Sequence, residues 1–188
     1  MTTMIKLPLR SLNLEVVRDL QEKYPEAEIS VNLHQDRNQA PLSESQFWKI
    51  IALLNWHQEG TDEAVVKPVI AHLAAGSTRH IFEFADILSE KLYALDGRVY
   101  AENMGEDAYA PDRYFSVDNF LYARCCVIAN GKKLYEQVKR NPTLMPRDFT
   151  FEALLYIPSE AYERKTGRKY DYSPAFPIET YSNKTGWK

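Results

Sequence analysis

The stretch Ser116–Asn130, SVDNFLYARCCVIAN, decides the fold that this chain adopts. From Phe120 to Ala129 its only strongly polar side chains are those of Tyr122 and Arg124. A helix that is apolar on every face has to be surrounded by other helices, and a charge within it needs a partner. The stretch therefore predicts the central helix of a multi-helix domain, with Arg124 enclosed in the core.

Amphipathic patterns on both sides of this stretch predict the helices that surround it. Ser43, followed three residues later by Gln46, has the pattern of a capping box. The predicted helices cover residues 47–56, 61–75, 79–96, 132–140 and 151–167. Pro68 is expected to kink the second of these helices, and Pro158 to kink or split the last.

The first 40 residues predict a small unit of a different kind. The apolar segment 4–9 and the alternation of polar and apolar residues at 28–33 each predict a strand. Between them, an amphipathic pattern predicts a helix that Pro25 ends. The polar segment 34–42 has the composition of a linker, which places a boundary near residue 40.

These patterns together predict a fold that is mainly α, and α+β overall. A βαβ-like strand–helix–strand element occupies residues 1–40. Because two strands are not stable alone, this element is expected to pack on the rest of the chain or on another copy. A multi-helix orthogonal or bundle-like domain with an aromatic C-terminal tail occupies residues 41–188.

The composition is that of a folded protein, with 45% hydrophobic and 26% charged residues in a chain of 188. A net charge of -3 and a pI of about 5.9 give no electrostatic reason to bind nucleic acid or anionic lipid. No apolar run approaches the length of a membrane span. Adjacent Cys125 and Cys126 have the pattern of small buried hydrophobic residues in a reducing compartment. The sequence therefore predicts a cytoplasmic protein that binds neither nucleic acid nor membrane.

Four blocks of this sequence resemble those of one known family and follow one another in the same order. They are QFWKIIALLN, IFEFADILSEKLYALD, FLYARCCVIANGKKLYE with the following NPTLMP, and EALLYIPSEAYERKTG. In these blocks, which span roughly residues 43–168, the chain resembles the bacterial DUF4240 family. That family is mostly helical and has no established function, so the resemblance implies a helical fold and no activity.

A candidate binding cluster is centred on Arg124. Asp86 and Glu90 lie one helical turn apart, and Glu83 precedes Asp86 by three residues, so one guanidinium can bridge their carboxylates. Asp96 is a further candidate for an acidic partner. One interpretation is a structural ion pair that fixes the helix packing. The other is a pocket in which Arg124 binds a carboxylate or a phosphate. The full cluster consists of Arg124, Glu83, Asp86, Glu90, Tyr93 and Tyr122.

Other chemistries have less support in the sequence. His80, Glu83 and Asp86 are spaced as metal ligands on a helix can be, but no second helix supplies a matching histidine. There is no nucleophile elbow and no glycine-rich phosphate loop, and no histidine lies near the two cysteines in sequence. The sequence therefore predicts no metal and no cofactor. It leans against an enzyme without deciding the question.

The leading functional hypothesis is a non-catalytic cytosolic protein-binding or regulatory module. Its partner, another protein or a second copy of the chain, would bind the N-terminal strands by edge addition or bind the aromatic tail. The alternative is a small-molecule-binding protein or an enzyme with an anion-binding pocket around Arg124. A pocket lined by Arg124, Asp86 and Tyr122 would favour the alternative, and a sealed Arg124 would favour the module.

Overall fold

The computed structural model describes residues 14–25, 40–57 and 60–188. The chain divides into two units, Met1–Arg37 and Asn38–Lys188.

The first unit is described at helix α1, Leu14–Lys23, which is the helix predicted between the two strands. Its apolar residues Val16, Val17 and Leu20 are half-buried. The predicted α+β class is wrong, because every regular element in the described ranges is helical and no strand occurs among them. The fold is therefore mainly α. The strands predicted at 4–9 and 28–33 lie outside the described residues.

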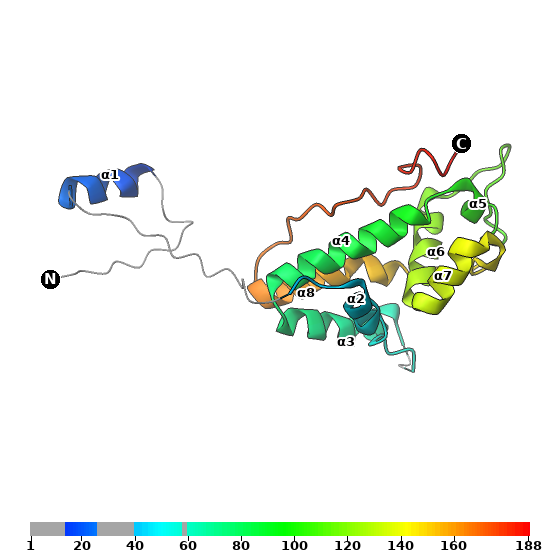
Figure 1. Ribbon diagram of the computed structural model, residues 1–188, viewed down its shortest axis with the longest axis horizontal. Helices are drawn as coiled ribbons and strands as arrows, with labels where there is room; N and C mark the ends of the chain where they lie inside the picture. Colours follow the sequence, from blue (N-terminus) through cyan, green and yellow to red (C-terminus); the bar gives the residue numbers. More distant parts are fainter. Residues whose placement is uncertain (1–13, 26–39, 58–59) are drawn as a thin grey trace. The chain divides into compact units, whose positions relative to one another are not determined.

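The second unit is a group of packed helices (Figure 1). Among its described residues, helices α2 to α8 and the 3-10 turns η2 and η3 follow one another along the chain. Their bounds are α2 Glu44–Ile51, α3 Asp62–Ala75, α4 Thr78–Ala94, α5 Arg98–Ala101, α6 Val117–Ala129, α7 Lys132–Arg140, η2 Pro142–Leu144, η3 Glu152–Tyr156 and α8 Ile157–Thr166.

Serine side chains cap the N-termini of α2, α4 and α6. Ser43 and Gln46 form the predicted capping box, in which each side chain binds the main-chain N–H of the other residue. The hydroxyls of Ser77 and Ser116 accept from the main-chain N–H three residues onward, each at 3.2 Å. These bonds satisfy N–H groups that have no partner within the helix, which fixes where each helix begins.

Pro68 and Pro158 affect their helices differently. Helix α3 continues through Pro68 from Asp62 to Ala75. The segment predicted as one helix at 151–167 is split, because η3 ends at Tyr156 and α8 begins with Pro158 in its first turn. A proline is tolerated there because the missing N–H would have no helical partner. Gly167 ends α8 with a φ of 65°, the left-handed conformation that glycine adopts most easily.

Helix α6 lies in the core of this unit, as predicted. Phe120 and every residue from Ala123 to Ala129 are buried. Helix α6 contacts α4, α7 and η3, while α8 packs against α3 and α4. Because a fully buried large apolar side chain contributes about 1.5–3 kcal/mol, this packing supplies much of the stability of the unit.

Residues 168–188, which we call the strap, form no helix and run along α4 to the C-terminus (Figure 1, orange to red). The strap ends against the start of α5, where the N–H of Arg98 donates to the carbonyl of Gly186 at 2.8 Å. A Cβ atom on Gly186 would lie 2.5 Å from the carbonyl oxygen of Asp96, so this close approach requires glycine.

Among the residues that the structure describes, none of the helices has both the length and the apolar character needed to cross a membrane.

Candidate functional site

Arg124 lies in the middle of α6 and is completely buried. Its guanidinium donates to the carbonyl of Leu92 at 3.0 Å, to the carbonyl of Ile178 at 3.0 Å and to the hydroxyl of Thr180 at 3.1 Å. The guanidinium carbon lies 4.8 Å from the centre of the Phe120 ring. Its Nε has no hydrogen-bond partner among the described residues. Arg124 therefore joins α6 to α4 and to the strap.

Burial lowers the pKa of Arg124 to about 10, and the negative charges of Asp96 and Glu179 oppose this shift. The guanidinium is therefore still protonated at neutral pH. A buried charge needs compensation from nearby dipoles or charges, and here two carbonyls provide most of the direct contacts. The side chain is a structural link between elements that are distant in sequence.

Two of the carboxylates predicted beside Arg124 have other partners. Glu83 accepts from the main-chain N–H of Leu42 at 2.8 Å and from Nε of Arg79 at 2.7 Å. Glu90 lies 3.8 Å from Nζ of Lys91 and is half-exposed. None of the ion pairs found among the described residues involves Arg124. A ligand-binding role for the predicted cluster stays a prediction.

The third predicted carboxylate, Asp86, binds the strap. It accepts from the hydroxyl of Tyr172 and from the main-chain N–H of Ala175, each at 2.8 Å. One turn later, the hydroxyl of Ser89 accepts from the main-chain N–H of Phe176 at 3.3 Å. Several residues of α4, and one just beyond its C-terminal end, face the strap. We call them the α4 row: Phe82, Asp86, Ser89, Tyr93 and Asp96.

At the far end of the α4 row, Asp96 is completely buried. It accepts from the main-chain N–H of Tyr181 at 3.2 Å and from that of Asn183 at 2.8 Å. The indole N–H of Trp187 donates to it at 2.8 Å. A buried carboxylate with three donors is well satisfied, and it anchors the end of the strap.

The two tyrosines of the predicted cluster lie in different places. The ring of Tyr93 packs on the Phe176 ring of the strap, with centroids 5.4 Å apart. The main-chain carbonyl of Tyr122 accepts from the N–H of Phe151, and a hydrogen bond with Glu152 raises the pKa of its hydroxyl. The structure therefore brings Arg124, Asp86 and Tyr93 to the strap, and leaves Glu83, Glu90 and Tyr122 outside this arrangement.

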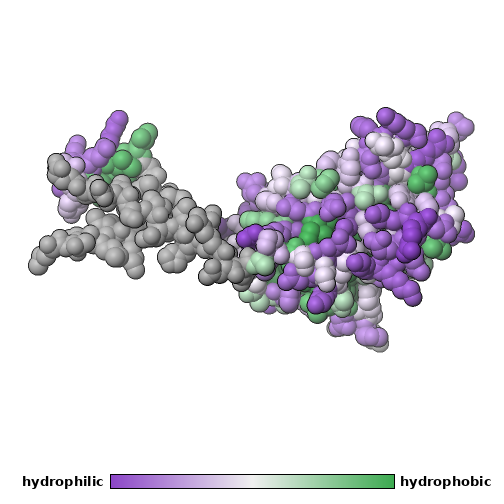
Figure 2. Space-filling model, in the orientation of Figure 1, coloured by the Kyte–Doolittle hydropathy of each residue, from purple (hydrophilic) through white to green (hydrophobic). Residues whose placement is uncertain are grey.

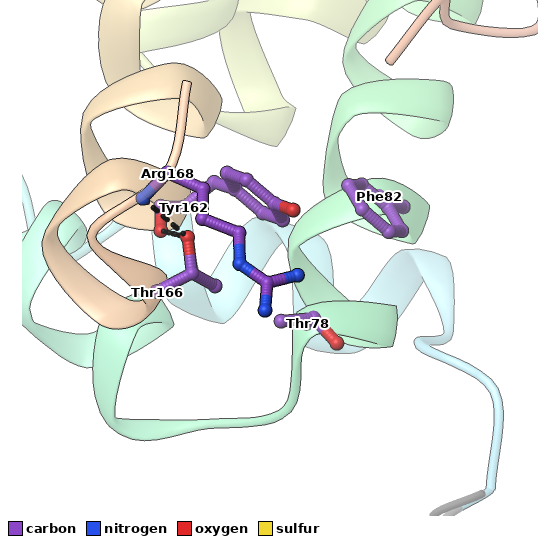
Figure 3. A pocket seen from close by; sticks show the side chains of 5 residues that line it. All are labelled: Thr78, Phe82, Tyr162, Thr166 and Arg168. Atoms are coloured by element: carbon purple, nitrogen blue, oxygen red, sulfur yellow. Dashed lines mark hydrogen bonds between the residues drawn. The ribbon is translucent and has the colours of Figure 1, made fainter. Parts of the chain in front are cut away.

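Near the N-terminus of α4, aromatic rings from three elements meet. Phe82 stacks on Tyr172 with centroids 4.4 Å apart, and on Tyr162 at 5.5 Å. Beside them lies a pocket of about 420 Å³, lined by Thr78, Phe82, Tyr162, Thr166 and Arg168. Figure 3 shows the exposed guanidinium of Arg168 reaching from the end of α8 toward Thr78. This pocket presents a cation at the surface beside aromatic rings.

The thiols have no features of a reactive site. Cys125 and Cys126 are buried in α6, and burial raises the pKa of both thiols. Because the thiolate is the nucleophile and the metal ligand, both groups are inert at neutral pH. In the described ranges, no group of three or more His, Cys, Asp or Glu side chains is placed to hold a metal ion. The ring of His80 contacts the carbonyl of Ala40 at 3.2 Å.

Sequence reasoning missed the strap residues that bind Arg124, which are Ile178 and Thr180. A signal was present on α4 and just beyond its end, where Asp86, Ser89 and Asp96 recur at helical spacing. Polar side chains on a face that also carries apolar residues need hydrogen-bond partners, which another segment has to supply. The identity of the segment was not predictable from this pattern, because the strap has no periodicity.

A family model described as "Protein of unknown function (DUF4240)" matches residues 42–164. The matched range contains Arg124 and the α4 row, while the strap lies beyond it. No curated protein and no solved structure matches the chain.

Proposed function

The chain belongs to the DUF4240 family, and we propose that its helical unit is a non-catalytic protein-binding or regulatory module that acts in the cytoplasm. The observation that carries the proposal is the arrangement around Arg124. The polar groups of the α4 row bind main-chain N–H groups of an extended segment, which is how a module holds a peptide. Here that peptide is the chain's own strap.

A surface formed partly by the strap supports this role. We call it the strap patch, and it consists of Tyr114, Val117 and Tyr181, which are 92%, 42% and 37% exposed. The hydroxyl of Thr180 donates to the carbonyl of Val117 at 2.7 Å, and the ring centres of Phe115 and Tyr181 lie 6.4 Å apart, so the segment that carries Tyr114 and Val117 adjoins the strap at Tyr181. Exposed aromatic and aliphatic side chains that lie together are typical of a partner-binding surface. The space-filling view in Figure 2 shows hydrophobic residues set among hydrophilic ones on one face of this unit.

The backbone of Tyr181 gives a second reason to select this patch. Its φ is 72°, a conformation that residues other than glycine rarely adopt. Its N–H is held by Asp96, and its ring lies 4.3 Å from that of Trp187. Strain of this kind persists where the surrounding contacts enforce it, and it is concentrated at functional sites. The strap patch is therefore a preformed surface.

The alternative function, an anion-binding pocket around Arg124, has less support. The guanidinium is completely buried, and its direct partners include strap atoms. An anion would reach it only after the strap had left α4. The proposed partner is thus another protein or a second copy of this chain, bound at the strap patch.

Photo-crosslinking in cells of the native host tests this proposal. Benzoylphenylalanine placed at Tyr114 is expected to give discrete protein adducts, which a second change, Tyr181→Ser, reduces. The matched control position is Lys67, an exposed residue of α3, where no adduct of the same mass is expected. The same adducts from both positions, or none from Tyr114, would contradict the proposal. Thermal stabilisation by the small-molecule filtrate of the lysate alone would favour the alternative.

A further inference from the structure

The pocket near the N-terminus of α4 is built from three separate elements (Figure 3). Thr78 and Phe82 belong to α4, Tyr162 and Thr166 to α8, and Arg168 to the strap. The volume of the pocket is about 420 Å³. An apolar cavity of about 150 Å³ is large enough for benzene, so this pocket has room for one aromatic ring and a polar group attached to it.

Local hydrogen bonds fix the backbone from which Arg168 reaches into the pocket. Gly167 ends α8 in the left-handed conformation, which turns the chain away from the helix axis. The hydroxyl of Thr166 donates to the carbonyl of Tyr162 at 2.8 Å and accepts from the main-chain N–H of Arg168 at 3.1 Å. Thr166 therefore uses its hydroxyl to hold the turn, and the guanidinium of Arg168 lies between the ends of α8 and α4 (Figure 3).

Two hydrogen-bond donors of the pocket have no partner. The guanidinium of Arg168 is exposed, and it forms neither a hydrogen bond nor an ion pair with any residue in the described ranges. The hydroxyl of Tyr162 also has no hydrogen bond to a described residue, and it is accessible to solvent. Figure 3 shows this hydroxyl between α8 and α4. Both donors are thus available to a ligand that enters from solvent.

The carboxylates next in sequence to the pocket residues do not neutralise this cation. Glu83 forms an ion pair with Arg79, with Oε1 and Nε 2.7 Å apart. Glu163 accepts from the main-chain N–H of Tyr170 at 3.3 Å. Neither carboxylate is paired with Arg168. The positive charge of Arg168 is therefore uncompensated beside a pocket that has aromatic walls.

We propose that this pocket binds a small molecule in which an aromatic ring carries an oxyanion, either a carboxylate or a phosphate. The guanidinium of Arg168 binds two oxygens of that group through parallel hydrogen bonds, a geometry that suits both oxyanions. The hydroxyl of Tyr162 supplies a further donor. The half-buried rings of Phe82 and Tyr162 contact the ring of the ligand.

The two parts of the ligand follow from the two parts of the wall. An inorganic anion would pair with the guanidinium but leave the aromatic walls in contact with water. A neutral aromatic molecule would cover the walls and gain nothing from the charge of Arg168. The site differs from the anion pocket considered around Arg124, which is completely buried, and it does not depend on the proposed protein-binding function.

Four probes test the proposal on the full chain by NMR titration: benzoate, benzamide, phenyl phosphate and inorganic phosphate. Benzamide has the shape of benzoate without its charge, and inorganic phosphate lacks the ring. Benzoate is expected to bind about tenfold more tightly than benzamide, and phenyl phosphate about tenfold more tightly than inorganic phosphate. The main-chain amide resonances of Thr166 and Arg168 are expected to shift. The tighter of benzoate and phenyl phosphate identifies the preferred oxyanion.

A pair of neighbouring variants separates a specific contact from a change in net charge. Arg168→Ala is expected to weaken benzoate and phenyl phosphate binding by about tenfold or more, and to leave benzamide binding unchanged. The matched control is Lys169→Ala, which removes the same charge from an exposed residue that does not line the pocket. It is expected to leave the binding of every probe unchanged. Tyr162→Phe keeps the ring and is expected to weaken benzoate binding by about threefold.

The proposal is overturned if none of the probes binds, or if benzoate and benzamide bind equally well. Equal binding of phenyl phosphate and inorganic phosphate would contradict the contact with the aromatic walls. Equal losses of benzoate binding in Lys169→Ala and Arg168→Ala would contradict the specific role of Arg168. Because Arg124 is intact in Arg168→Ala, a loss confined to that variant also separates this site from the anion pocket considered around Arg124.

Discussion

Helix α6 and the strap meet at Arg124, but they are held in the molecule by different interactions. In α6, seven consecutive residues from Ala123 to Ala129 are buried. In the strap, no residue is fully buried, and hydrogen bonds to the α4 row hold it. The comparison shows that hydrocarbon burial places the charge of Arg124, whereas directional polar bonds supply its partners.

The largest loss of stability is expected from removing the side chain of Arg124, where α6 and the strap meet. Arg124→Ala deletes the three hydrogen bonds of the guanidinium and leaves a cavity beside α6. We expect the free energy of unfolding to fall by about 3–5 kcal/mol, measured by urea denaturation. Arg168→Ala, at an exposed arginine, is the control and is expected to change it by less than about 0.5 kcal/mol. Near-wild-type stability of Arg124→Ala would refute a structural role for this residue.

Asp96→Asn tests the polar anchor of the strap separately from α6. The amide keeps the size of the side chain but replaces one carboxylate oxygen with a group that cannot accept from the strap. Because the buried carboxylate loses hydrogen bonds that its charge strengthens, we expect the free energy of unfolding to fall by about 2 kcal/mol. The indole N–H resonance of Trp187, which donates to Asp96, should shift in the NMR spectrum of the native state. An unchanged spectrum would show that Asp96 does not hold the strap end.

A smaller effect is expected at the partly exposed start of the strap. Tyr172→Phe removes the hydroxyl that donates to Asp86 and keeps the ring that stacks on Phe82. We expect a loss of about 0.5–1 kcal/mol in the free energy of unfolding. Asp86→Asn should lose less when Tyr172→Phe is already present than in the wild type, because the two side chains share this bond and only the bond from the Ala175 N–H is then weakened. Full additivity of the two changes would contradict the contact.

Alkaline pH is expected to destabilise the core around α6, with no effect at neutral pH. Burial raises the pKa of Cys125 above its ordinary value of 9.0, and it raises that of Tyr135 as well. The unfolded chain therefore releases protons that the folded chain keeps, so stability falls as pH rises above about 9. Arg124 has the opposite sign, because its pKa of about 10 lies below its unfolded value of 12.5. Urea midpoints that are equal at pH 7 and pH 8.5 and lower above pH 9.5 would agree with this account.

The sequence predicted what depends on local pattern. The apolar run of α6, the burial of Arg124 and the capping box at Ser43 follow from side chains within one or two turns of each other. Family membership was also predicted from the order of the sequence blocks. These features require no knowledge of which distant segments meet.

The arrangement of the strap was not predictable, because irregular segments have no periodicity that reveals their neighbours. Asp86 was assigned to Arg124 because it shares a helix face with Glu90, so that one guanidinium can bridge the two carboxylates, yet Asp86 accepts from the main-chain N–H of Ala175. A main-chain N–H is present at nearly every residue, so no letter of the sequence marks it as a partner. The fold class was wrong for a different reason. Period-two alternation over a short run predicts a strand, but every regular element among the described residues is helical.

Hydrogen exchange at the main-chain amides of Ala175 and Asn183 tests the central claim most directly, that the α4 row holds the strap and thereby seals Arg124. Both amides donate to carboxylates of the row, at 2.8 Å each. We predict that both are protected in the wild type, and that Asp96→Asn removes the protection of Asn183 while helix α3 stays protected. Exchange of both wild-type amides at the rate of an unstructured peptide would contradict the account.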